Sequence, residues 1–190
     1  MVRVRTASGA LVAISRLRKG EKVLATITRT GKTGPAAVTA VLLHYDKDLL
    51  DLEISVDGRI AVIRTTSSHL FWDLTQGRWV KAGALKYGDH LRTPTGSSAT
   101  VVGDRTSRRH EGWMWDITVP GPDDFYVRAA TAAVLVHNGM CFDLPSPFGK
   151  DVTAVIGRRP DINAARPWPG HDVLTLGNGA KRETMNGSLV

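Results

Sequence analysis

The tripeptide His137-Asn138-Gly139 combines residue types that could break a peptide bond. The side-chain amide of an asparagine can attack its own main-chain carbonyl carbon, which closes a five-membered succinimide and cleaves the next peptide bond. Gly139 adds little bulk beside that bond. His137, with an unperturbed pKa of about 6.5, can donate a hydrogen bond to the carbonyl or protonate the departing amine. Asn-Gly is also the favoured pair of a type I′ turn, so an ordinary turn is the alternative.

Thr66 and His69, in the stretch Thr65-Thr66-Ser67-Ser68-His69, form a second candidate group. In a Thr-x-x-His pattern the histidine can protonate a departing amide nitrogen while the hydroxyl orients that bond. A structural histidine is the alternative.

Asp123 and Asp124 follow Pro120-Gly121-Pro122 and form a third group. One of these carboxyl groups could act as an acid or base if burial raised its pKa. Otherwise both are solvated turn residues.

Short runs rich in β-branched residues, separated by turn residues, position these groups. The predicted strands are Lys22–Ile27, Ala37–Leu43, Leu49–Ile54, Ile60–Arg64, Thr100–Val102, Met114–Val119, Phe125–Val127 and Ala133–Val136. Breakers are predicted at Gly31, Gly34-Pro35, Asp57-Gly58, Gly77, Thr95-Gly96 and Pro120-Gly121-Pro122, and Asp57-Gly58 indicates a tight hairpin. The pattern is all-β up to about residue 138.

A short repeat divides this β-rich part into two halves. The segments Leu17–Val23 and Leu85–Leu91 share the pattern Leu-x-x-Gly-acidic-x-aliphatic, and each introduces a strand. Common turn chemistry is the alternative explanation. After Asn138 the prolines and glycines become frequent and strand alternation fades, so we expect one domain over residues 1–138 and an irregular tail over residues 139–190.

The composition narrows the possible classes of protein. The net charge of +7 comes from scattered basic residues, which argues against a contiguous nucleic-acid footprint. The single cysteine, Cys141, permits neither an intramolecular disulfide nor a cysteine-based metal site. We expect no signal peptide and no transmembrane segment, because no apolar run follows Met1 and none approaches the roughly 18 residues of a span. The cellular compartment stays open.

Taken in order, several blocks of the sequence resemble the Hint superfamily of intein-like and hedgehog-type autoprocessing domains, above all those of bacterial polymorphic toxins. The resemblance covers about residues 1–139. It rests on Val23–Thr26, Gly31–Pro35, Asp48–Leu52, Thr66–Trp72, Trp79–Leu91, Trp115–Val119, Phe125–Val127 and Val134–Asn138. In the tail, Ala154–Arg158 and Trp168–Leu174 look like the start of a toxin-like module.

The resemblance implies a horseshoe of short strands built from two pseudo-two-fold halves. It also implies single-turnover cleavage after Asn138 without metal or cofactor, the chain's own C-terminal segment being the substrate. His137 would assist at the carbonyl, and Thr66 and His69 would belong to the upstream half of the site. A toxin context would bring export within a larger protein and leave room for an immunity protein as partner.

Three departures from the family pattern limit this expectation. The opening Cys or Ser is missing, since the chain begins Met1-Val2-Arg3. Asp123 and Asp124 occupy the region where a helper histidine is common. Gly139 replaces the Cys, Ser or Thr that splicing requires, so cleavage is expected only on the C-terminal side.

A degenerate, inactive Hint scaffold that links or binds is therefore the alternative function. An unrelated β-domain that binds nucleic acid is a third reading, and the scattered charges disfavour it.

Overall fold

The computed structural model describes residues 2–96, 98–106, 110–129 and 131–138, together with four short strands in the C-terminal segment. Strands make up most of this part. It holds two one-turn 3-10 helices, η1 (Ile14–Arg16) and η2 (Ala82–Ala84), and no α-helix. The strands before Asn138 are β1 (Arg3–Arg5), β2 (Leu11–Ala13), β3 (Lys22–Ile27), β4 (Lys32–Ala37), β5 (Ala40–Asp46), β6 (Leu49–Val56), β7 (Arg59–Thr66), β8 (Leu70–Asp73), β9 (Arg78–Lys81), β10 (His90–Arg92), β11 (Ser98–Thr106), β12 (Gly112–Thr118), β13 (Asp124–Ala129) and β14 (Ala132–His137).

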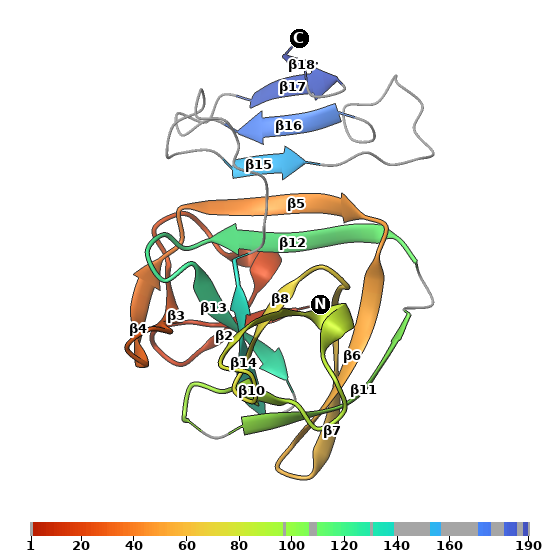
Figure 1. The fold of residues 1–190 in the computed structure, drawn as a ribbon. Coiled ribbons are helices and arrows are strands. Elements are labelled where there is room, and N and C mark those ends of the chain that lie inside the picture. Colours follow the sequence, from red (N-terminus) through yellow and green to blue (C-terminus); the bar gives the residue numbers. More distant parts are fainter. Residues whose placement is uncertain are drawn as a thin grey trace.

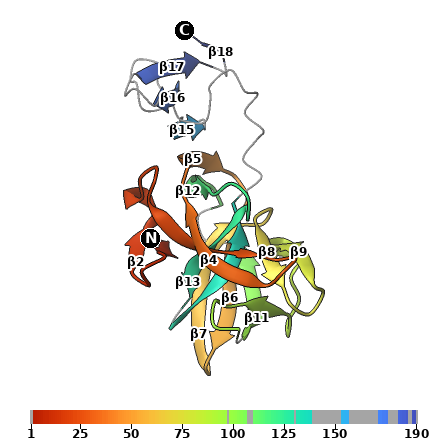
Figure 2. The same cartoon turned by 90° about the vertical axis from the view of Figure 1, so that its left-hand side faces the viewer.

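One long sheet curls around the core of the molecule (Figures 1 and 2). Its strand order is β2-β1-β13-β14-β8-β10-β11-β6-β7, and β9 pairs with β8. Strand β14 therefore lies in the middle of the sheet, between β13 and β8. The buried side chains of Phe71, Phe125 and Val136 belong to one core cluster with residues from β1, β3, β6 and β11. The strand that directly precedes Asn138 is thus supported on both edges and packed against the core.

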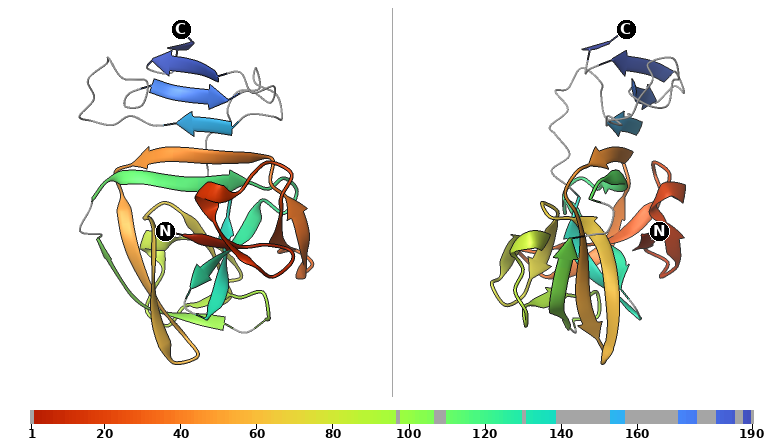
Figure 3. Two further views of the ribbon diagram at one scale, coloured as in Figure 1. Left: turned by 180° about the vertical axis from the view of Figure 1, so that it is seen from behind. Right: turned by 90° about the vertical axis from the view of Figure 1, so that its right-hand side faces the viewer.

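A ribbon of the two strands β5 and β12 runs across one end of this sheet, as the rear view in Figure 3 also shows. In the C-terminal segment, β15 (Thr153–Ile156) pairs in parallel with β5, and β16 (His171–Thr175), β17 (Lys181–Met185) and β18 (Ser188–Leu189) follow in antiparallel order. The sequence had indicated no strands there. The domain boundary at residue 138 stays a prediction.

The fold confirms the all-β class and corrects two details. Gly34-Pro35 does not break a strand but lies within β4, and the predicted strand Ala37–Leu43 is divided between the end of β4 and the start of β5. Proline is tolerated because β3 and β4 form a two-stranded sheet, so β4 has an outer edge that needs no donor. Asp57 and Gly58 both have positive φ angles, 50° and 73°, as a type I′ hairpin turn requires.

The two repeated segments adopt the same local structure. Each follows a 3-10 helix, and Gly20 and Gly88 have φ angles of 88° and 90°. The Gly20 N–H donates to the Val38 carbonyl (2.8 Å), and the Gly88 N–H donates to the Val101 carbonyl (2.9 Å).

The acidic residue that follows each glycine also plays the same part. A carboxylate oxygen of Glu21 accepts from the Arg18 N–H (2.9 Å), and one of Asp89 accepts from the Lys86 N–H (2.8 Å). The echo in the sequence therefore marks a pseudo-two-fold relation between two halves.

Replacing either glycine of the repeat should destabilise the domain. The left-handed backbone costs a residue with a Cβ about 1–2 kcal/mol, so Gly20→Ala and Gly88→Ala should each lower the free energy of unfolding by about that amount. Gly34→Ala is the matched control, since Gly34 has no positive φ angle and an added Cβ would meet nothing within 4 Å. Denaturant unfolding measures the effect, and equal stability of all three variants would contradict it.

Candidate functional site

Asn138 directly follows β14 and is held from several directions. Its backbone N–H donates to the Asp123 carbonyl (2.9 Å), and its side chain is 8% exposed. The hydrogen-bonding groups around it favour the amide orientation in which Oδ1 accepts from the Val119 N–H (3.1 Å) and Nδ2 donates to the Asp123 carbonyl (2.5 Å). The connection from β12 to β13 thus fixes both the backbone and the side chain of this asparagine.

His137 contacts the carbonyl of the following residue. Its Nδ1 lies 2.8 Å from the Asn138 carbonyl oxygen. A carbonyl oxygen only accepts, so Nδ1 carries the proton of this hydrogen bond. The imidazole also meets Trp79 edge to face, with ring centroids 5.0 Å apart, and Trp79 packs in the same way on Trp72. These tryptophans restrict the ring to an orientation in which it polarises the carbonyl that cyclisation would attack.

Thr66 and His69 come together in a pocket of about 180 Å³, which Val2, Asp46 and Asp116 also line. Loss of solvent around its ring lowers the pKa of His69 below the usual 6.5; Asp116 acts in the opposite direction, and His137 lowers it further. His69 is therefore uncharged at neutral pH. The influence of His137 also shows that the two predicted groups are electrostatic neighbours.

Asp48 shapes the turn that carries Thr66 and His69. Its Oδ2 accepts from the Ser67 hydroxyl (2.7 Å) and the Ser68 N–H (3.2 Å), while its carbonyl accepts from the Ser67 N–H (2.8 Å). On the other side, Gly83 of η2 lies so close to Ser67 that an added Cβ would stand 3.2 Å from the serine Cβ. The conformation of the turn is therefore fixed from two directions.

Two acidic residues of this pocket were missed as site residues by the sequence analysis. Asp116 is buried on β12, and Asp46 ends β5. Burial raises the pKa of Asp46 to about 6, and the negative charges of Asp48 and Asp116 add to the shift. For Asp116, the sequence did offer a signal of a site residue, namely a carboxylate at an inward position of an apolar strand, since Asp116 stands between Trp115 and Ile117.

The geometry matches a family and a group of solved structures. The model of the pretoxin Hint domain family matches residues 3–139. The chain belongs to this family. The solution structure of a bacterial intein-like domain from Clostridium thermocellum is 30% identical, with a TM-score of 0.62, over 72% of this chain and 94% of that one. The DnaB intein of Synechocystis sp. PCC 6803 is 23% identical, with a TM-score of 0.61, over 73% and 95% of the two chains, and shows the fold alone.

No curated protein matches the chain in sequence. Membership of the Hint family nevertheless supports autoprocessing as the general class of activity, with the domain's own flanking sequence as substrate. Among the described residues no helix is long and apolar enough to span a membrane, and no three metal-ligating side chains gather into a site.

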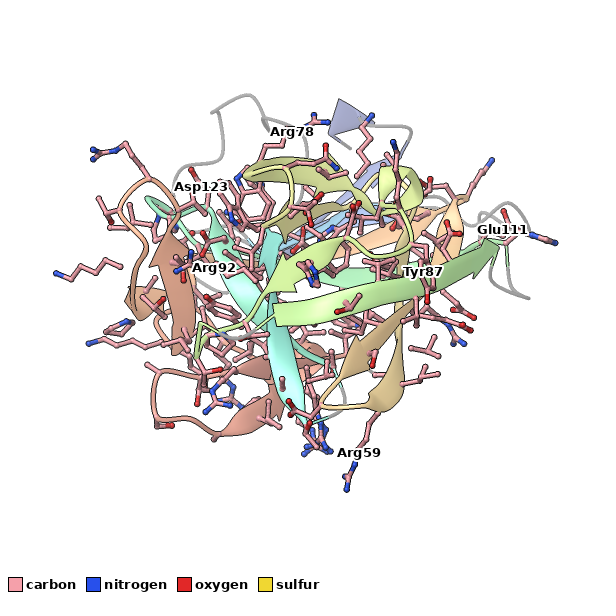
Figure 4. The ribbon with its side chains drawn as sticks, turned by 60° about the horizontal axis from the view of Figure 1, so that its bottom comes forward. Arg59, Arg78, Tyr87, Arg92, Glu111 and Asp123 are labelled. Carbon is pink, nitrogen blue, oxygen red and sulfur yellow. The ribbon has the colours of Figure 1, made fainter. Side chains whose placement is uncertain are left out.

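In this Hint domain the two neighbouring aspartates have different surroundings. Asp123 is exposed, and Figure 4 shows its side chain at the surface of the molecule. It has a φ angle of 57°, and its backbone carbonyl accepts a hydrogen bond from the Asn138 N–H. Asp124 is fully buried, and its Oδ1 accepts from the Thr26 N–H of β3 (2.7 Å). Its Oδ2 has no hydrogen-bond partner among the described residues.

Burial raises the pKa of Asp124 to about 7, although the Thr26 hydrogen bond acts against the shift and Asp123 adds to it. Asp124 is the register partner of His137 across β13 and β14. Its Oδ1 accepts from Thr26 of β3, however, so the structure ties this carboxyl group to the packing of the β3–β4 hairpin. An acid–base role for either aspartate stays a prediction.

The raised pKa of Asp124 makes stability depend on pH. Between pH 3.8 and about 7 the folded state holds a proton that the unfolded state has lost, so the free energy of unfolding falls as the pH rises through this window. Asp124→Asn imitates the protonated form. We expect its stability relative to the wild type to increase by about 2 kcal/mol from pH 5 to pH 8.

Urea unfolding at both pH values measures this difference. Asp57→Asn, which removes an exposed carboxylate in a turn, is the control and should keep the wild-type slope. An equal change in the free energy of unfolding of the wild type and of Asp124→Asn between pH 5 and pH 8 would show that Asp124 is ionised in the folded state throughout this range.

Proposed function

We propose that this Hint domain cleaves its own peptide bond after Asn138 and frees the C-terminal segment as an effector. The contact between His137 Nδ1 and the Asn138 carbonyl oxygen, at 2.8 Å, carries the proposal. An ordinary Asn-Gly turn does not require it. In addition, Asn138 follows a strand in the middle of the sheet, where its carbonyl is held in place by buried neighbours.

In the proposed step, Asn138 Nδ2 forms a bond to the Asn138 carbonyl carbon, and the bond from that carbon to the Gly139 nitrogen breaks. Nδ2 loses one proton, and the departing amine gains one, so no further reactant is needed. The negative charge that develops on the carbonyl oxygen is stabilised by the N–H of His137. The Asp123 carbonyl, which accepts from Nδ2, is positioned to hold the amide until attack.

The pocket around Thr66 and His69 would activate a peptide bond on the N-terminal side of residue 1. Val2 lines this pocket, so the start of the chain lies beside both side chains. His69 is neutral at pH 7 and would have to take up a proton before it could protonate a departing nitrogen. Asp46, with its pKa raised to about 6, lies in the same pocket and would be a proton source only below about pH 6.

The second candidate function is an inactive scaffold that links or binds. It is considered because Val2, which lines the upstream pocket, carries no nucleophilic side chain. Asparagine cyclisation does not need a nucleophile in the upstream pocket. The two functions therefore differ in whether a fragment cleaved after Asn138 is formed. Under either function an immunity protein as partner stays a prediction.

The test of cleavage is incubation of the purified chain near neutral pH, followed by mass spectrometry under denaturing conditions. Denaturing conditions matter because β15 pairs with β5 and could hold two fragments together. We expect a fragment that ends at Asn138 as a succinimide or its hydrolysis product. Asn138→Ala should abolish it, and an intact wild-type chain after prolonged incubation would contradict self-cleavage.

The chain contains matched controls for this experiment. Asn178-Gly179 and Asn186-Gly187 are two further Asn-Gly pairs in the same molecule. Asn178→Ala and Asn186→Ala should leave cleavage after Asn138 unchanged. Cleavage at all three pairs, or cleavage that persists in urea, would indicate ordinary succinimide chemistry of Asn-Gly rather than a folded site.

Replacement of His137 tests its contact with the carbonyl. His137→Ala should slow cleavage by about 10²–10⁴-fold, because the carbonyl loses its general acid. Trp79→Phe keeps an aromatic ring beside residue 137 and should slow cleavage far less. The first-order rate of fragment appearance measures both, and a His137→Ala rate equal to the wild-type rate would remove His137 from the mechanism.

A further inference from the structure

The outer edge of β7 is an open side of the long sheet. In the described part of the chain β7 is the last strand of the sheet and pairs only with β6. Along β6 and β7, hydrogen-bonded and non-hydrogen-bonded residue pairs alternate, starting from the tight turn. Val56 and Arg59 form the first hydrogen-bonded pair. Residues at every second position, Ile60, Val62 and Arg64, therefore direct their N–H and carbonyl groups outward, away from β6.

The same three residues also present exposed side chains. Ile60 is 69% exposed and Val62 50%, and the Arg64 side chain is 60% exposed, although it contacts Asp51. Figure 4 shows Arg59, at the start of β7, extending from the tip of the hairpin into solvent. A long edge with unpaired backbone groups and apolar side chains is one that proteins usually cover or block with charge.

A pocket of about 720 Å³ lies along this edge. Its walls come from β1, β7, β12 and β13, and its lining includes three arginines and two tryptophans but no acidic residue. These lining side chains include Arg3, Arg64, Arg128, Val62, Trp113 and Trp115. It adjoins the pocket around Thr66 and His69, and the two share Val2, Ile14, Ile63, Arg64, Met114 and Trp115.

We propose that the edge of β7 and this pocket form a docking site for an extended acidic peptide, which adds to the sheet as a further strand. The outward backbone groups supply hydrogen bonds, as in other cases of strand addition. The arginines select carboxylate side chains, and Val62 and Trp115 select apolar ones. A purely electrostatic ligand such as a nucleic acid would leave the backbone edge unused.

The test uses the full chain with Asn138→Ala, so that it stays whole and the result does not depend on cleavage. The probes are a fluorescein-labelled peptide of alternating glutamate and valine, the same peptide with lysine for glutamate, and an acidic peptide with proline for valine. Fluorescence anisotropy measures binding. We expect binding of the glutamate–valine peptide alone, weakened by salt and by Arg128→Glu.

Hydrogen exchange tests strand addition directly. On binding, the amides of Ile60, Val62 and Arg64 should exchange more slowly, while those of Ala61 and Ile63, which already face β6, should not change. Val62→Pro removes one outward N–H without removing a bond to β6, and should weaken binding by about three- to tenfold. Val62→Ala, which keeps that N–H, is its control.

Three results would overturn the proposal. They are equal binding of the acidic and basic peptides, binding of the acidic peptide without slower exchange at the three amides, and tighter binding of a short single-stranded DNA. If Val62→Pro fails to fold, the exchange pattern of the Asn138→Ala chain still decides.

Discussion

The hydrogen bond from the Asn138 N–H to the Asp123 carbonyl is the interaction on which the site depends. It continues the ladder between β13 and β14 one residue beyond their last register pair, Asp124 with His137. The left-handed conformation of Asp123 lets the connection from β12 close at this point. Asn138 is thereby kept in a strand-like position although the named strand has ended, and its carbonyl comes within reach of the His137 ring.

This constraint also explains why the two groups of reactive side chains lie near each other. Val136 on β14 is the register partner of Phe71 on β8, and His69 precedes β8 and packs edge to face on Phe71. The middle of the sheet therefore places the Thr66–His69 turn beside the end of β14. Burial keeps the pKa of His69 below its usual value, and the nearby His137 adds to this effect.

The strands and the reactive residue types could be predicted from the sequence, but the contacts between them could not. Apolar runs of five or more residues, such as Leu49–Ile54, were found because alternation over that length is specific. Strands β1, β2 and β10 have three residues each, too few for any periodicity to show.

Thr66 and His69 could be named because they stand together in the chain. Asp46, Asp48 and Asp116 meet them only through the pairing of β5 with β12 and the turn after β5, and no local pattern records that pairing. Asp123 and Asp124 looked equivalent in the sequence, and only the structure separates them, by burial and by backbone conformation.

In the proposed function, breaking the peptide bond after Asn138 and separating the two products are different events. The ribbon of β5 and β12 has one open edge, and β15 occupies it through two register pairs, Val155 with Leu43 and Ile156 with His44. Before cleavage the covalent link keeps β15 at a high effective concentration beside β5, so even a short pairing persists. Cleavage removes this advantage without touching the pairing itself. The segment would then leave at a rate set by a few backbone hydrogen bonds, each of which contributes only about 1 kcal/mol against solvent. A domain that uses a short parallel pairing at this edge can therefore hold β15 in place before the proposed cleavage and still lose it soon afterwards.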